Sequence, residues 1–274
     1  MTTFSRYVAL GDSTTEGLDD PYPAAAGGEL VYRGWADRLA ERLAAVNPDL
    51  LYANLAVRGR LMAAIHEEQL EPALAMEPDL ASVIGGVNDV LRPKVDLDAL
   101  GGHMRAMQSA LIAQGATVLG MTLPDLGDSM GVARIVSERL AAYNQLIRDV
   151  AADTGAIVVD IEREAPQYDP ACWSEDRLHA NAKGHELIAL AAADALDLPG
   201  AAEELAAIIA SAAPVVHRGR LREAAYEAAW AWNHLRPWIV RRLRGRSSGD
   251  GIEPKRPRLE PVASDAGAER EAAR

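Results

Sequence analysis

The chain has 274 residues, of which 49% are hydrophobic and 25% are charged, enough to bury the core of one large domain or two small ones. It holds no apolar run near the roughly 18 to 20 residues that cross a bilayer, and its single cysteine, Cys172, excludes an internal disulfide and a cysteine-rich metal site. The formal net charge of −12 at pH 7 argues against a general nucleic-acid binder.

Short apolar runs alternate with longer segments of helical spacing through most of the chain. The runs are rich in Val, Ile, Leu and Ala and cover 7–10, 51–56, 80–84, 116–123 and 156–161. The helical segments cover about 33–46, 60–76, 98–114, 134–153 and 182–196. This alternation predicts one doubly wound α/β domain over residues 1–199, with a parallel sheet of about five strands and helices on both faces.

Capping residues mark the ends of several predicted helices. Asp98 and Asn181 are expected to be N-caps, because each precedes or opens a helical segment and carries a side-chain oxygen that can accept a backbone N–H. Gly115 and Gly155 stand just past helical segments and just before apolar runs. Both glycines are therefore expected to adopt the left-handed conformation that ends a helix.

The two ends of the chain depart from this pattern. Residues 1–5 lack the basic and apolar segments of a secretory signal, which favours a cytoplasmic protein. Residues 247–274 are dominated by Gly, Pro, Ser, Ala and charge. Such a composition buries too little apolar surface to fold alone, so this tail is expected to be disordered.

Residues 200–246 are predicted to form a helical extension that becomes basic. Between 214 and 246 the chain carries eight arginines and two glutamates. Three tryptophans lie close together there: Trp230, Trp232 and Trp238. A basic aromatic helix can make peripheral contact with an anionic membrane through 217–246, or it can pack its aromatic face on the acidic body. Packing is preferred because Pro237 interrupts the helix.

A serine stands where the first predicted strand ends. Gly11-Asp12-Ser13 follows that strand directly, at the edge where open α/β folds bind ligands. A serine hydroxyl is a weak nucleophile unless a histidine takes its proton and a third group orients the histidine. Asp176 and His179 follow the fifth strand, and their spacing lets the carboxylate reach the imidazole of the same turn. Ser129, in a second Gly-Asp-Ser, lies in an irregular stretch beyond Pro124, so Ser13 is the candidate nucleophile.

Two further loops at the same edge carry hydrogen-bond donors. Gly59, after the second strand, offers an unobstructed backbone N–H, and Asn88, after the third, offers a side-chain amide. Donors that converge from separate loops can form an oxyanion hole. Asp12 and Asp89 are expected to bind loop N–H groups and so to support the shape of the site.

The order of these blocks resembles the SGNH hydrolases, also called the GDSL esterase/lipase family. The resemblance spans roughly residues 5–197 and rests on four blocks: Gly11-Asp12-Ser13, Gly59, Gly86-Val87-Asn88-Asp89 and Asp176-Arg177-Leu178-His179. It implies a three-layer α/β/α flavodoxin-like fold and a small-molecule ester substrate, with no metal or organic cofactor.

The resemblance also implies a role for each matching residue. Ser13 would be the nucleophile, His179 the general base and acid, and Asp176 the residue that orients it. The N–H groups of Ser13 and Gly59 would form the oxyanion hole together with the Asn88 amide. The expected reaction is ester hydrolysis through an acyl-enzyme.

Other functions fit parts of the same pattern. An acyltransferase would use the same triad with an alcohol in place of water, and the sequence does not separate the two. A nucleotide-binding module or a non-catalytic membrane-docked protein could share the fold, but residues 11–17 match neither glycine-rich phosphate motif. His185 is a rival base, expected to pack away from the loop. His66-Glu67 does not make a zinc-protease motif, because Leu70 stands where the second histidine is required.

Overall fold

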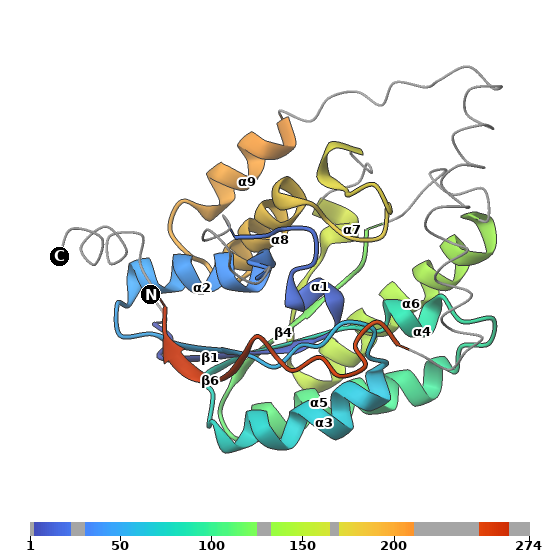
Figure 1. The fold of residues 1–274 in the computed structure, drawn as a ribbon, viewed down its shortest axis with the longest axis horizontal. Helices are drawn as coiled ribbons and strands as arrows, with labels where there is room; N and C mark the ends of the chain where they lie inside the picture. Colours follow the sequence, from blue (N-terminus) through green and yellow to red (C-terminus); the bar gives the residue numbers. More distant parts are fainter. Residues whose placement is uncertain (1–2, 23–30, 125–132, 165–169, 211–246, 263–274) are drawn as a thin grey trace.

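A computed structural model describes residues 3–22, 31–124, 133–164, 170–210 and 247–262 (Figure 1). Ser129 and the tryptophan-rich part of the predicted extension lie outside these residues. None of the helices within the described ranges is long and apolar enough to cross a membrane.

The core of the molecule is a six-stranded sheet in the order β5-β4-β3-β1-β2-β6. Its strands are β1 (Arg6–Gly11), β2 (Leu51–Asn54), β3 (Leu80–Ile84), β4 (Thr117–Met121), β5 (Ile157–Val159) and β6 (Arg256–Pro261). The first five run parallel, as predicted, and β6 pairs antiparallel with β2. The chain moves from β1 to β2 on one side and to β3 on the other, so the strand order reverses beside β1. Ligands bind at such a switch point, outside the carboxyl ends of the strands.

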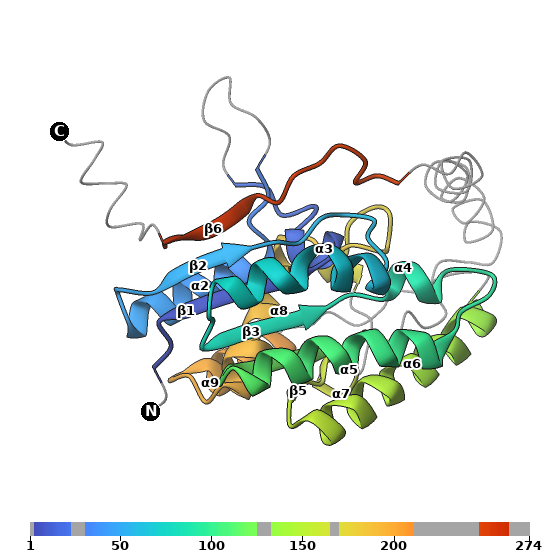
Figure 2. The same ribbon diagram turned by 90° about the horizontal axis from the view of Figure 1, so that it is seen from below.

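Helices cover both faces of the sheet, which gives the three-layer α/β/α architecture (Figures 1 and 2). One layer holds α2 (Gly34–Val46), α8 (Ala182–Ala195) and α9 (Ala201–Ala210), and the other holds α3 (Met62–Ala75), α5 (Leu97–Ala113) and α6 (Ala133–Thr154). Short turns of helix follow three strands: α1 (Ser13–Glu16), α4 (Val87–Val90) and α7 (Ile161–Glu164).

The position of β1 in the sheet explains why its sequence is almost continuously apolar. Tyr7 and Ala9 belong to the hydrophobic cluster under α2 and α8, whereas Val8 and Leu10 belong to the cluster under α3 and α5. Successive side chains of a strand point to opposite faces, and here both faces are buried. The apolar run therefore fixes β1 at the centre of the sheet, with its end inside the molecule.

The helix ends follow the predicted capping chemistry, with one correction. Asn181 caps α8, and its side chain accepts the N–H groups of Lys183 and Gly184. Gly115 and Gly155 adopt φ values of 95° and 87°, as expected of residues that end helices. The prediction for Asp98 is wrong: the N-cap of α5 is Asp96, whose side chain accepts the N–H of Ala99, and Asp98 lies within the first turn.

For residues 247–262, strand β6 corrects the expectation that the tail 247–274 is disordered, and residues 263–274 lie outside the described residues. Residues 256–261 pair with β2, the guanidinium of Arg256 lies 5.5 Å from the ring centroid of Tyr52, and the buried Lys255 ammonium lies 2.8 Å from Asp37. The sequence of β6, Arg-Pro-Arg-Leu-Glu-Pro, lacks the alternating apolar pattern of a strand. Its order comes from the open edge of β2 and from an ion pair with α2, neither of which a local pattern can reveal.

Candidate active site

The end of β1 is held by contacts that leave no room for a side chain at Gly11. A Cβ there would overlap the carbonyl oxygen of Ile84 and the hydroxyl of Thr15. The buried Gln69 side chain accepts the Gly11 N–H at 2.8 Å and donates to the Gly11 carbonyl at 2.9 Å. Ser13 is therefore presented from a fixed backbone, as the first residue of α1.

The three residues of the predicted triad lie in contact. His179 Nε2 is 2.9 Å from Ser13 Oγ, and His179 Nδ1 is 2.6 Å from Asp176 Oδ2. The other oxygen of Asp176 accepts the backbone N–H of His179 at 3.0 Å and the hydroxyl of Ser174 at 2.7 Å. Asp176 thus holds both the ring and the backbone of His179, and the imidazole connects it to the serine hydroxyl.

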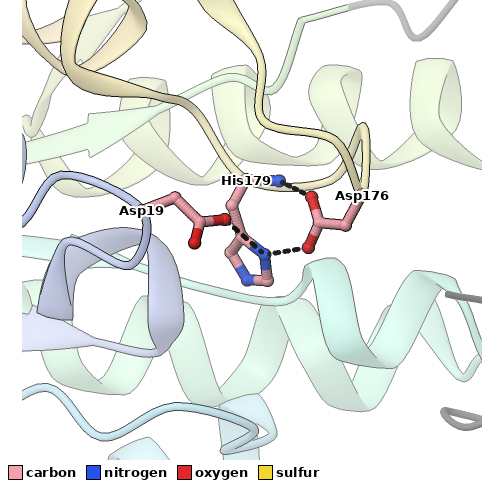
Figure 3. Close-up of side chains that lie close together, drawn as sticks. All are labelled: Asp19, Asp176 and His179. Carbon is pink, nitrogen blue, oxygen red and sulfur yellow. Dashed lines mark hydrogen bonds and ion pairs between the residues drawn. The ribbon is translucent and has the colours of Figure 1, made fainter. Parts of the chain in front are cut away.

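The charges around His179 favour its protonated form. Burial alone would lower the pKa of the imidazole, but the hydrogen bond and charge of Asp176 outweigh it and raise the pKa above its ordinary value of 6.5. Burial would likewise raise the pKa of Asp176, but the hydrogen bond and charge of His179 outweigh it and hold that pKa far below its ordinary value. Figure 3 shows the imidazole between Asp176 and Asp19, whose carboxylate lies 4.0 Å from Nδ1 and adds to the rise.

Asn88 connects the Gly11-Asp12-Ser13 turn, called the serine turn below, to the loop that follows β2. Its side-chain N–H groups donate to Asp12 Oδ2 at 3.2 Å and to the Arg60 carbonyl at 3.1 Å. Asp12 also accepts the N–H of Thr14 at 3.1 Å, and Asp89 accepts the N–H of Met62 at 3.1 Å. Asp12 and Asp89, which are expected to bind loop N–H groups, each accept a backbone N–H from the first turn of a helix, α1 or α3. Burial raises the pKa of Asp12 to about 6.

Gly59 has φ of 73°, a conformation that L side chains rarely adopt. Within the described residues, the N–H groups of Gly59 and Ser13 donate no hydrogen bond to the protein. The residue before Gly59 is tied to the serine turn: the buried Glu16 carboxylate accepts the Arg58 N–H at 2.7 Å and pairs with its guanidinium. The two predicted backbone donors therefore have no hydrogen-bond partner among the described residues, whereas Arg58, beside Gly59, is bonded to Glu16.

His185, the rival base, has a packing role, as expected. Its Nδ1 accepts the N–H of Trp35 at 3.1 Å, and its Nε2 lies 2.9 Å from the Leu18 carbonyl. These partners assign the ring proton to Nε2. Burial lowers the pKa of His185 to about 4, so the ring is neutral. Its two nitrogens hold α2 and the loop after α1 together.

Several supporting residues have no strong signal in the sequence. Gln69 directly follows His66, Glu67 and Glu68 on α3, so it looks like part of a solvated helix face, and Glu16 looks like an ordinary acidic residue in a first turn. The hydroxyl of Tyr143, on α6, donates to the Gly85 carbonyl at 2.6 Å, and a Cβ at Gly86 would overlap that hydroxyl.

A mainly apolar cavity of about 630 Å³, including its open mouth, adjoins the site. Its walls include Thr14, Val87 and Leu178, which are the chain neighbours of Ser13, Asn88 and His179. The other walls include Val90, Leu91, Met121, Leu123, Leu140, Ile161, Trp173 and Ile188. If a carbonyl carbon were bound beside Ser13 Oγ, an apolar group attached to that carbon could be covered by these side chains.

Within the described ranges, one group of side chains could hold a cation, and it consists of Asp19, Asp176 and His179. They offer three ligand atoms within 4.8 Å of one another. Asp176 and the imidazole are already joined by the 2.6 Å hydrogen bond, so a cation would have to compete with that bond.

Comparison with known proteins agrees with this architecture. The model of the GDSL-like lipase/acylhydrolase family matches residues 9–187. LAE5, an α/β hydrolase enzyme from the metagenome of Lake Arreo, Spain, is 22% identical with a TM-score of 0.60, over 72% of this chain and 97% of that one. Axe2, an acetylxylan esterase from Geobacillus stearothermophilus, is 21% identical with a TM-score of 0.57, over 71% of this chain and 94% of that one.

At these identities the likeness to the two solved structures is one of fold. No curated protein matches the chain. The family match covers more than half of the chain, and it includes the serine turn and the segment from Asp176 to His179. The chain therefore belongs to the GDSL-like lipase/acylhydrolase family, and it is a hydrolase that acts on ester bonds.

Proposed function

We propose that the chain hydrolyses carboxylic esters through an acyl-enzyme on Ser13, with His179 as general base and acid and Asp176 as its orienting partner. The observation that carries this proposal is the unbroken relay from Ser13 Oγ through both imidazole nitrogens to Asp176, with steps of 2.9 and 2.6 Å. A relay of this geometry activates a serine hydroxyl and stabilises the imidazolium that forms.

In the acylation half, Ser13 Oγ attacks the ester carbonyl carbon while its proton passes to His179 Nε2. The carbonyl oxygen becomes an oxyanion, which the N–H groups of Ser13 and Gly59 and the amide of Asn88 would stabilise. The bond to the leaving alkoxide then breaks, and His179 returns the proton to the alcohol. The acyl group remains on Ser13 as an ester.

In the deacylation half, a water molecule replaces the alcohol. His179 removes its proton as the water attacks the acyl carbon, and the oxyanion forms again in the same place. When the bond to Ser13 breaks, the serine oxygen recovers the proton from His179 and the carboxylic acid leaves. The Asp176 carboxylate stays ionised throughout, since its pKa is far below neutral.

Asn88 must change its bonding for this role. Both of its amide hydrogens are engaged, one with Asp12 and one with the Arg60 carbonyl. An oxyanion beside Ser13 would draw one of these hydrogens into a shared bond, because a charged acceptor competes well with a neutral carbonyl.

The apolar cavity supports an acyl group with a hydrocarbon chain as the preferred substrate class. Each CH2 that enters such a cavity contributes about 0.8 kcal/mol, so kcat/KM should rise with acyl length until the cavity is filled. A series of p-nitrophenyl esters from acetate upward tests this preference. A rate that is highest for acetate and falls at once with added CH2 groups would assign the site to short acyl groups, as in the acetylxylan esterase Axe2.

The proposal is tested by replacing, one at a time, the two serines that end a Gly-Asp-Ser sequence. Ser13→Ala should abolish hydrolysis of a p-nitrophenyl ester, because the nucleophile is lost. Ser129→Ala is the matched control and should retain most of the activity. Equal activity of the two variants would contradict the assignment of Ser13.

A further inference from the structure

The turn over residues 247–252 packs against the loop that carries Gly59. Gly249 touches this loop with its backbone: a Cβ there would overlap the carbonyl oxygen of Arg58 and lie 3.0 Å from Val57 Cγ1. Ser247 Oγ donates to the Gly59 carbonyl at 3.3 Å, across a separation of 188 positions in the sequence. A distant downstream segment thus contacts a loop of the candidate active site.

The contacted atoms determine where the Gly59 N–H points. The Arg58 carbonyl and the Gly59 N–H belong to one planar peptide unit, so a group that fixes the oxygen also fixes the N–H at the opposite side. Gly249 lies against that oxygen. The N–H of Arg58, one peptide earlier, is held by the Glu16 carboxylate at 2.7 Å, and the Gly59 carbonyl, one peptide later, is held by Ser247.

Such support matters because a glycine does not hold its own conformation. Gly59 populates positive and negative φ about equally well in a free chain, so the Arg58–Gly59 peptide could rotate and turn its carbonyl toward the site. A carbonyl in that position would repel an oxyanion. Contacts from outside the loop are therefore needed to keep the N–H in one orientation.

We infer that the 247–249 turn positions the Arg58–Gly59 peptide for catalysis, with Gly249 as its steric support and Ser247 as its hydrogen-bond support. The inference rests on the proposed function, in which the Gly59 N–H is an oxyanion donor. Gly249 and Ser247 are positioning residues: they act through the peptide and touch no reacting atom.

The turn itself is built to be rigid. The Ser247 hydroxyl accepts the N–H of Gly249 at 3.2 Å, and Asp250 accepts the N–H of Ser247 at 3.0 Å. Beyond it, Lys255 donates to the carbonyls of Tyr32 and Arg33 at 2.9 and 2.7 Å, and β6 pairs with β2. The segment is thus anchored to the sheet and to the start of α2, so it can hold the loop in place.

The direct test is Gly249→Ala in the full-length enzyme, assayed with p-nitrophenyl acetate. The added methyl group must displace either the Arg58 carbonyl or the turn, and a donor misplaced by about 1 Å can cost about 100-fold. We expect kcat to fall about 10- to 100-fold with KM changed less than about threefold, as for a group that acts in the transition state. Gly102→Ala is the matched control, because Gly102 is exposed on α5 with open space around its Cα.

A second pair of variants keeps the test decisive if Gly249→Ala does not fold. Ser247→Ala removes the hydrogen bond to the Gly59 carbonyl and should lower kcat several-fold, whereas Ser247→Thr keeps the hydroxyl and should restore most of it. An unchanged kcat in Ser247→Ala, or in a folded Gly249→Ala, while Ser13→Ala is inactive, would overturn the inference and leave the proposed function standing. Activity in Ser13→Ala would overturn both.

An oxyanion-specific readout separates positioning from a general loss of structure. A thionoester places sulfur, a weaker and larger acceptor, where the ester places oxygen, so a well-aimed N–H discriminates strongly between them. Gly249→Ala should slow the ester more than the matching thionoester and so narrow the ratio of their rates. An equal loss on both substrates would show that Gly249 supports folding alone, and would overturn the inference.

Discussion

At the scale of single residues, His179 is the group whose protonation should control activity. Its imidazole must be neutral to accept the Ser13 proton. Its pKa is raised above 6.5 because the hydrogen bond and charge of Asp176, together with the charge of Asp19, outweigh the effect of burial. Activity should therefore be low in acid and should rise as the pH passes through this raised pKa. A profile of kcat/KM against pH measures the midpoint.

Asp19 offers a way to move that midpoint. Asp19→Asn removes a negative charge 4.0 Å from Nδ1 and leaves the Asp176 hydrogen bond in place, so the rise in activity should shift to lower pH. Asp49→Asn, at an exposed position of the loop before β2, is the matched control and should leave the midpoint unchanged. An unchanged midpoint in Asp19→Asn would show that the charge of Asp19 does not reach the imidazole.

Asn88 is the residue that should separate transition-state stabilisation from substrate binding. Asn88→Ala removes one of the proposed oxyanion donors, and kcat should fall by about 10² to 10³ with little change in KM. The same variant loses the bonds to Asp12 and Arg60, so its melting temperature must be measured beside its kinetics. A normal kcat with a greatly raised KM would make Asn88 a substrate-binding residue.

Much of the site could be predicted from residues in the loops that follow strands. Ser13, Asn88 and His179 come to one edge of the sheet because parallel strands end there together. The supporting contacts could not be predicted in this way. Gln69 and Tyr143 act through hydrogen bonds to backbone groups of distant loops, and no local spacing distinguishes such a residue from an ordinary helical one.

At the scale of elements, the buried ion pair between Lys255 and Asp37 joins the segment 247–262 to α2. The Asp37 carboxylate also accepts the hydroxyls of Tyr52 and Tyr22 at 2.7 and 3.0 Å. Lys255→Met would leave this buried charge without its cation, at a cost of about 3 kcal/mol in the free energy of unfolding. Urea denaturation measures this cost, with Lys94→Met, at an exposed position, as the matched control.

Sequence patterns predicted the five parallel strands and missed β6. The two kinds of strand differ in what stabilises them. The five parallel strands are apolar because helices cover both of their faces, so their composition alone reveals them. Strand β6 carries charges and two prolines and is stabilised by pairing with one edge. Prolines and charges are ordinary on edge strands, so this sequence does not differ from that of a loop.

At the scale of the whole molecule, the segment 247–262 closes one edge of the sheet. A chain that ends at residue 246 would expose the edge of β2 and lose the Lys255 ion pair, and its melting temperature should fall by about 6 to 12 °C if these contacts contribute about 3 kcal/mol. A chain that ends at residue 262 keeps every described contact of this segment and is the matched control. Equal melting temperatures of the two shortened chains would show that β6 does not stabilise the domain.

The central claim is that one serine, Ser13, carries the acyl group. A fluorophosphonate reacts covalently with a serine that a histidine activates, and peptide mass spectrometry locates the modified residue. We predict one label per chain, on the peptide that contains Ser13, and no label in the Ser13→Ala variant. Labelling of Ser129 or of any other serine, or full labelling of the Ser13→Ala variant, would contradict the account.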